Sequence, residues 1–172
     1  MTQASQPKTI VLFTDGSCIN NGKSNARGGM GVHFPNKELV DLSQPYSPHL
    51  IKDFTDSTAC TNQKTELYAI LLALRYINNK LKLRSFDKIT IITDSQFSID
   101  CFTKWARGWC KNNWQSSKNQ DVKNKQVIQL IYKYVLEYNN IEFKHVRSHT
   151  GKTDFESVGN DKADQLANLA AA

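Results

Sequence analysis

Apolar residues recur along the chain at two spacings, which divide it into predicted strands and predicted helices. Short apolar runs, several of them rich in β-branched residues, predict strands. These runs cover residues 10–13, 27–34, 37–43, 88–93 and 141–146. The second and third are separated by a tight turn at Pro35 and Asn36, so the first three strands predict an antiparallel meander. Residues 44–60 show no clear period, and we expect a loop there.

Apolar residues three and four positions apart predict helices in the rest of the chain. The spacing from Leu67 to Leu81 predicts an amphipathic helix, for which Thr61 and Asn62 are both suitable N-caps. Other helices are predicted at residues 95–104, 127–138 and from about 159 to the C-terminus. The stretch from Trp105 to Lys125 breaks the helical pattern with tryptophans and many basic or amide side chains.

Two acidic residues follow predicted strands at equivalent places. Asp15 comes after the run that ends at Phe13, and Asp94 follows the run that ends at Thr93. A strand, a crossover helix and another strand normally pair in parallel, which would place Asp15 beside Asp94. Carboxylates that close repel unless a cation neutralises them, and oxygen ligands favour magnesium or manganese over zinc. The Asp15–Gly16 pair is also a strong turn signal, so we expect a turn there.

Other acidic residues are candidates for the same site. Glu66 shares its helical stripe with Ile70, so its carboxylate is expected to lean toward the sheet. Asp161 and Asp164 lie in the last predicted helix. For all three, the alternative is an acidic residue in a first turn that complements the helix dipole and extends into solvent.

Composition narrows the class of protein. A chain of 172 residues predicts one domain, at residues 8–172, after a flexible N-terminal segment at residues 1–7. No apolar stretch approaches the roughly eighteen residues of a membrane span, and the start MTQASQPK has no apolar signal core, so we expect a soluble, intracellular protein, cytoplasmic or nuclear. We also expect a monomer. The net charge of +6 and pI near 9.1 favour a polyanionic partner. The four cysteines form neither a CxxC pair nor a zinc spacing and are expected to be reduced thiols.

Five short motifs occur in a fixed order along the chain. They are TDGSC, TNQKTELYA, ITDSQ, VRSHTG and GNDKADQLA. This series resembles ribonuclease H of type 1, the endonucleases that cut the RNA strand of an RNA/DNA hybrid, over nearly the whole chain. The resemblance implies an α/β ribonuclease H-like fold. Its five-stranded mixed sheet would combine the three-strand antiparallel meander with parallel strands, flanked by helices and a basic protrusion.

The resemblance also implies a site with two Mg²⁺ ions, for which Mn²⁺ can substitute. The residues that match the metal-binding carboxylates are Asp15, Glu66, Asp94 and Asp164. Asp164 is chosen over Asp161 because the ligand in the family pattern stands directly before Gln, Leu and Ala. Asp15 is expected to bridge both ions, and Gly16 to let the backbone pass close to RNA. His149 resembles a mobile-loop histidine that assists proton movement or product release.

Two surfaces that hold the duplex follow from the same resemblance. The matches to RNA-strand contacts are Cys18, Asn20, Asn21, Asn62 and Gln63. The matches to DNA-strand or phosphate contacts are Thr61, Lys104, Trp105, Arg107, Trp109, Lys111, Lys118 and Asn124. Turn chemistry and helix capping are the alternative for the polar group, and we expect both roles for Asn62. For at least one of Trp105, Trp109 and Trp114, the alternative is an anchor on the core.

The chain also departs from the family pattern. Ala59 stands where some eukaryotic members carry an Arg that grips the DNA phosphate, and the loop at 44–58 has no assigned role. Three histidines match no family motif and are expected to be structural or solvated: His33, His49 and His145.

The function that follows is hydrolysis of the RNA strand of a hybrid, without sequence specificity, leaving 5′-phosphate and 3′-hydroxyl ends. The alternatives are another nuclease of the same fold, such as an exonuclease or resolvase, or a hybrid-binding module without catalysis.

Overall fold

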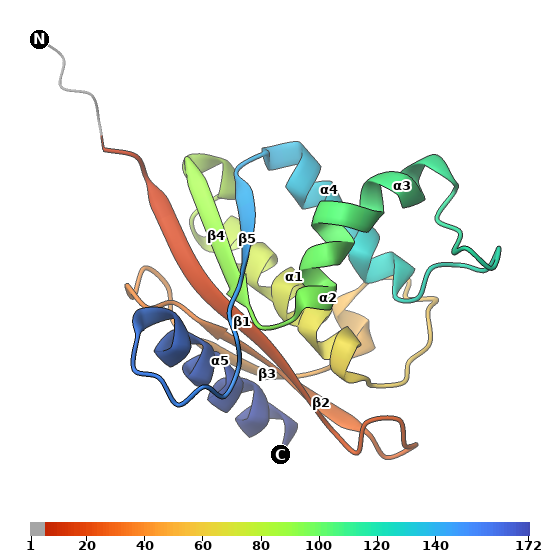
Figure 1. Ribbon diagram of the computed structural model, residues 1–172, viewed down its shortest axis with the longest axis horizontal. Coiled ribbons are helices and arrows are strands. Elements are labelled where there is room, and N and C mark those ends of the chain that lie inside the picture. The colour runs from red at the N-terminus through yellow and green to blue at the C-terminus, as the bar shows by residue number, and fades with distance from the viewer. Residues whose placement is uncertain (1–5) are drawn as a thin grey trace, which may run out of the picture.

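A five-stranded sheet forms the centre of the protein, in the order β3-β2-β1-β4-β5 (Figure 1). The computed structural model describes residues 6–172, so most of the predicted flexible segment at 1–7 lies outside the described residues. The strands are β1 (Thr9–Ile19), β2 (Arg27–His33), β3 (Leu42–Pro45), β4 (Lys88–Thr93) and β5 (Ile141–His145). β1, β2 and β3 are antiparallel, whereas β4 and β5 run parallel to β1. The predicted mixed sheet is confirmed.

Helices cover both faces of this sheet. They are α1 (Asn62–Lys80), α2 (Gln96–Asp100), α3 (Ala106–Lys111), α4 (Lys125–Tyr138) and α5 (Phe155–Ala171), with short 3-10 turns η1 (Pro48–Leu50) and η2 (Leu83–Ser85). Consecutive glycines of β2 show the two layers, because a Cβ at Gly28 would meet Thr65 of α1, whereas one at Gly29 would meet Ala167 of α5. α4 packs against the outer side of α1 (Figure 1). α1 therefore lies inside the main hydrophobic core.

The third strand is displaced from its predicted place at 37–43. The chain turns at Lys37, whose φ is 60°, and β3 begins only at Leu42. The carboxylate of Asp41 accepts the backbone N–H of Phe34 at 2.8 Å and contacts His33 Nδ1 at 2.8 Å. A side chain thus satisfies the donor that a pairing strand would have satisfied. The predicted loop at 44–60 accordingly contains the end of β3 and η1.

Helical structure extends farther than predicted at two places. α2 continues through a π-helical turn at Cys101–Trp105 into α3, so the helix predicted at 95–104 reaches Lys111. α5 begins at Phe155, because the side chain of Asp154 caps it by accepting the N–H of Ser157 at 3.2 Å. Asp161 and Asp164 therefore lie beyond the first turn, and their interpretation as first-turn acidic residues was wrong.

Candidate active site

The candidate site forms where the parallel pairing of β1 and β4 ends. The two strands pair up to Phe13 and Ile92, and β1 then continues against β2 alone. Asp15 lies on this continuation, and Asp94 follows the last residue of β4, so the two are neighbours as predicted. The predicted turn at Asp15 and Gly16 was wrong, because both residues lie within β1 and pair with β2.

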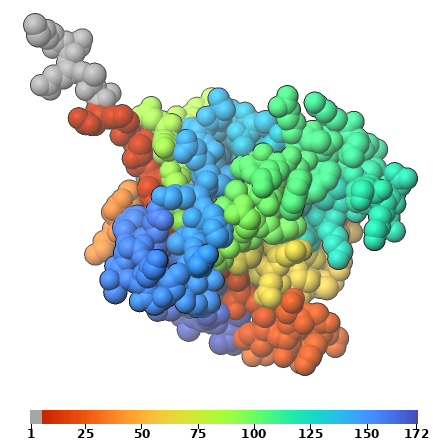
Figure 2. All heavy atoms as spheres, in the orientation of Figure 1, coloured from red at the N-terminus to blue at the C-terminus, as the bar shows by residue number. Residues whose placement is uncertain are grey.

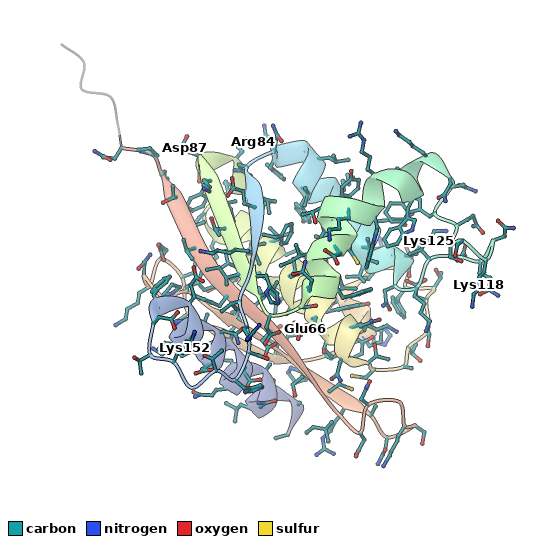
Figure 3. The ribbon with its side chains drawn as sticks, in the orientation of Figure 1. Glu66, Arg84, Asp87, Lys118, Lys125 and Lys152 are labelled. Carbon is teal, nitrogen blue, oxygen red and sulfur yellow. The ribbon has the colours of Figure 1, made fainter. Side chains whose placement is uncertain are left out.

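Gly16 brings the beginning of α1 directly against β1. A Cβ atom at Gly16 would lie 2.3 Å from the backbone N of Glu66 and 2.6 Å from Thr65 Oγ1. Only glycine permits so close an approach. The close contact that requires glycine is therefore with α1, whereas we expected it to be with RNA. Its consequence is that Glu66 lies at the same edge as Asp15, where α1 meets the sheet (Figure 3).

Three carboxylates gather at this point. Asp15, Glu66 and Asp94 each contribute an oxygen, and these oxygens lie within 4.8 Å of one another. Asp15 is 3% exposed, and Glu66 Oε2 is buried without a hydrogen-bond partner. Burial raises the pKa of all three groups, and mutual repulsion raises the pKa of Asp15 and Glu66 further. Carboxylates in this state need protons or a cation, and an all-oxygen set fits Mg²⁺ or Mn²⁺.

Asp164 approaches the same group from the opposite face of the sheet. A Cβ at Gly31 would lie 2.2 Å from the carbonyl oxygen of Ala163, so α5 packs tightly on β2 just before Asp164. The negative charge of Asp164 raises the pKa of Glu66 and Asp94. Asp164 is half-exposed and accepts from Asn168 Nδ2 at 3.1 Å. The structure thus brings Asp164 to the edge of the three-carboxylate group.

Two residues hold Asp94: Asn160, which the sequence analysis missed, and His145, which it expected to be structural or solvated. The amide Nδ2 of buried Asn160 donates to Asp94 Oδ2 at 3.3 Å, which lowers the Asp94 pKa. Asn160 lies four residues before Asp164, so the helical spacing could have revealed it. His145 Nε2 lies 3.2 Å from the backbone oxygen of Asp94, which agrees with the expected structural role of this histidine.

His149 lies in the loop between β5 and α5, with a φ of 51°. Its positive charge lowers the pKa of Asp94, as does that of His145, which places both histidines near the carboxylates. The structure therefore brings His149 close to the site as the resemblance implied.

A cleft of about 730 Å³ runs along the beginning of α1. It is lined both by predicted RNA contacts, Asn21, Asn62 and Gln63, and by predicted phosphate contacts, Thr61 and Asn124. Asn21 Oδ1 accepts the backbone N–H of Asn62 at 3.2 Å, which fixes the turn after β1 to α1. The two groups of predicted contacts thus share one surface.

Thr61, and not Asn62, caps α1. Thr61 Oγ1 accepts the N–H of Lys64 at 3.2 Å, so the capping role expected for Asn62 was wrong. The hydroxyl of Thr61 keeps its own proton for donation to a bound group. The other predicted RNA contacts lie nearby on β1 and its turn: Cys18 has its sulfur 3.2 Å from that of Cys60, both as free thiols, and Asn20 has a φ of 58°.

The basic protrusion projects from the side of the molecule as the green and teal lobe in Figure 2. The basic residues predicted to contact DNA are all exposed: Lys104, Arg107 and Lys111 follow one another along the π-helical turn and α3, and Lys118 lies at the tip (Figure 3). Lys123 is a further exposed basic residue of this region. Lys104 pairs with Asp100 at 3.3 Å.

The tryptophans of this region form a continuous row. Ring centroids are 5.9 Å apart for Trp105 and Trp109, and 5.8 Å apart for Trp109 and Trp114. Trp109 and Trp114 pack against the core, as the alternative interpretation held, whereas Trp105 is 39% exposed. Trp105 therefore has the larger free face for a ligand.

Within the described part of the chain, none of the helices has the length and hydropathy of a membrane-spanning segment.

Comparisons with known proteins agree with this geometry. The family model for RNase H matches residues 7–172. The "Probable ribonuclease H" of Acanthamoeba polyphaga mimivirus is 45% identical over 151 residues, which cover 88% of this chain and 61% of that protein. Ribonuclease H1 of Rattus norvegicus is 32% identical over 166 residues, 95% of this chain and 50% of that protein. The chain thus spans 50% to 61% of the length of these relatives.

A solved structure has a fold similar to that of this chain. The foamy viral protease-reverse transcriptase in complex with RNA/DNA hybrid is 21% identical and aligns with a TM-score of 0.73, over 99% of this chain and 21% of its own. Because the family model spans residues 7–172, almost the whole sequence, this chain belongs to the ribonuclease H family.

Proposed function

We propose that this protein is a metal-dependent endonuclease that hydrolyses the RNA strand of RNA/DNA hybrids without sequence specificity. The observation that carries this proposal is the group of three carboxylates within 4.8 Å in a chain of the ribonuclease H family. Two relatives are named ribonuclease H, and one protein of like fold was solved with an RNA/DNA hybrid. The proposed products carry 5′-phosphate and 3′-hydroxyl ends.

The proposed cofactors are two Mg²⁺ ions, for which Mn²⁺ can substitute. The residues proposed to hold them are Asp15, Glu66, Asp94 and Asp164. These residues would hold the ions, and the bound metal would supply activation of a water for in-line attack and stabilisation of the leaving 3′ oxygen. Asp15 would be a central ligand of these ions, because it is 3% exposed and its carboxylate lies within 4.8 Å of those of Glu66 and Asp94.

The remaining groups at the site either hold Asp94 in place or transfer protons. Asn160 and His145 hold Asp94 through its carboxylate and its backbone oxygen. His149, in the adjacent loop, is proposed to carry a proton near the attacking water or to assist product release. These roles require no contact with the bases.

The substrate would be recognised through shape, backbone and 2′-hydroxyl groups. Asn21, Asn62 and Gln63, together with Cys18 and Asn20, would contact the RNA strand. The row of tryptophans and the basic protrusion would take the DNA strand, with one phosphate at Thr61 and Asn124. A single chain carries all of these groups, which supports a monomer as the active form.

A panel of substrates tests the proposal. An internally labelled RNA/DNA hybrid with blocked ends, a DNA duplex and an RNA duplex are each incubated with and without Mg²⁺. We expect internal cuts in the RNA of the hybrid, only with the metal. Cleavage only from free ends would indicate an exonuclease, and tight binding of the hybrid without cleavage would indicate a binding module. Cleavage of the RNA duplex as fast as the hybrid would contradict the proposed DNA-strand surface.

A further inference from the structure

The segment of residues 53–59 joins the two helix ends that form the cleft. Asp56 and Ala59 line the cleft, together with Thr61 at the beginning of α1 and Asn124 at the beginning of α4. The space-filling view shows the beginning of α1, in yellow, between the orange turn after β1 and the teal protrusion (Figure 2). Any movement of this segment would therefore change the cleft.

Lys64 ties the segment to α1. Its side chain is 4% exposed, and Nζ donates to the backbone oxygens of Ser57 and, at 2.9 Å, of Ala59. The ammonium also lies 5.9 Å from the ring centroid of Phe54. Two of the three N–H donors of this lysine are therefore used in hydrogen bonds to the segment, which leaves one for a ligand.

Gln126 and Asp56 tie the segment to α4. Gln126 Oε1 accepts the N–H groups of Thr55 at 2.7 Å and Asp56 at 3.2 Å, and Nε2 donates to the Asp53 oxygen at 3.1 Å. In return, Asp56 Oδ2 accepts the backbone N–H of Gln126 at 3.0 Å. The helix's own N-cap, Asn124, has a φ of 60° and caps with no side-chain hydrogen bond. Asp56 therefore caps α4 from a distant part of the chain.

We propose that the segment 53–59 positions the DNA-phosphate contacts, with Asp56, Lys64 and Gln126 as positioning residues. Because Asp56 takes over the capping of α4, the Asn124 amide stays available to a phosphate in the cleft that Thr61 also lines. Ala59 offers no charge here, so the pocket depends on the placement of neutral donors. An acidic residue in a phosphate-binding cleft is otherwise unfavourable, and the capping bond accounts for it. This inference rests on the proposed function.

Two substitutions of Asp56 separate positioning from charge. Both Asp56→Ala and Asp56→Asn remove the negative charge from the cleft. Only Asn keeps an oxygen that can accept the backbone N–H of Gln126. We expect Asp56→Ala to raise KM for the hybrid about five-fold with kcat unchanged, as loss of a cap predicts. Asp56→Asn should have a KM equal to or below that of the wild type. If both variants lower KM, or both leave it unchanged, the proposal is overturned.

A second pair of variants tests Gln126 with a series of modified hybrids. Gln126→Met removes the three side-chain bonds to the segment but keeps the backbone N–H that Asp56 accepts. Gln129→Met, on the next turn of the same helix, is the matched control. Each hybrid carries one neutral methylphosphonate linkage at a different place in the DNA strand. In the wild type and in Gln129→Met, one placement should raise KM more than the others. In Gln126→Met that difference should vanish.

The outcomes of this series are distinct. If Gln126→Met keeps the same sensitive placement as the control, the segment does not position the phosphate contacts. If the wild type cleaved no hybrid, the proposed function would be wrong. The phosphate contact could then still be measured by direct binding of the same hybrids in Mg²⁺. Thermal melting of each variant shows whether it is folded, and a poorly folded Gln126→Met leaves the decision to the Asp56 pair.

Discussion

The carboxylate group and the proposed duplex-binding surface are built by opposite means. The carboxylates are placed by regular elements in direct backbone contact, and Asp15 is 3% exposed. The duplex surface consists of exposed side chains on a turn, two helix ends and a protrusion, held by side-chain bonds such as that between Asp56 and Gln126. Burial of a charged carboxylate lowers the stability of the folded state and strengthens the attraction of that carboxylate to a cation. The comparison predicts large effects of single substitutions in the first region and small, additive effects in the second.

The largest effect is expected from Asp94→Asn. Asn has the same shape as Asp and keeps an oxygen that can accept from Asn160, but the change removes one negative charge from the proposed metal site. We expect kcat to fall about 1,000-fold, while hybrid binding stays within about three-fold of the wild type. Single-turnover cleavage and fluorescence anisotropy measure the two quantities. Undiminished turnover would remove Asp94 from the metal site.

Asp164 and Asp161 provide a matched pair on one helix. Asp164→Asn should lower kcat about ten-fold, less than Asp94→Asn, because Asp164 lies outside the three carboxylates whose oxygens are within 4.8 Å of one another. Asp161→Asn should stay within about two-fold of the wild type. Steady-state cleavage of the hybrid in Mg²⁺ decides between them, and a larger loss for Asp161 would reverse the assignment.

The basic protrusion should respond through binding alone. Replacing Arg107 and Lys111 together by Ala should raise KM several-fold with kcat unchanged. It should also reduce the slope of log K against log salt by about 2, one for each lost phosphate contact. Arg84→Ala is the control, because η2 precedes β4 and lies at the opposite end of that strand from Asp94 (Figure 3). An unchanged salt slope in the double variant would exclude phosphate contacts by these residues.

The last effect concerns stability without metal rather than activity. The folded pKa of Asp15, Glu66 and Asp94 is raised, so between the ordinary carboxyl pKa of about 4 and neutral pH the folded state holds protons that the unfolded chain has released. Stability in EDTA should therefore fall as pH rises through this window.

Asp15→Asn removes the most strongly perturbed of these groups. We expect the variant to be about 1 to 2 kcal/mol more stable than the wild type at pH 8 in EDTA. Mg²⁺ should stabilise the wild type more than the variant. Thermal melting at pH 5 and pH 8 measures both effects, and a wild type that gains stability with pH in EDTA would contradict them.

Local patterns predicted those parts of the site that depend on one element at a time. The end of an apolar run located Asp15 and Asp94, and helical spacing oriented Glu66. The turn predicted at Asp15 and Gly16 failed because a dipeptide does not reveal that β2 pairs along this part of β1.

Contacts between distant parts of the chain could not be predicted. Gln126 and Asp56 are 70 residues apart, and Asn160 and Asp94 are 66 apart, so no local period connects them. The start of α5 was misplaced for a simpler reason, since Asp154 with Ser157 is a local cap that precedes the first strongly apolar stripe of that helix. The fold and the carboxylates were therefore accessible from sequence, and helical spacing could have placed Asn160 on the face of Asp164. The partners of Asn160, Asp56 and Gln126 were not accessible, because they lie in distant parts of the chain.

The contact between Gly16 and α1 lets the main chain fix the distance between β1 and α1 at the site. Side chains change rotamer at little cost, but two backbone segments in contact resist compression. The separation of Asp15 from Glu66 is thus set by the absence of a single methyl group at position 16. An alanine there would act as a wedge, parting strand from helix and widening the gap between two carboxylates while every ligand keeps its identity.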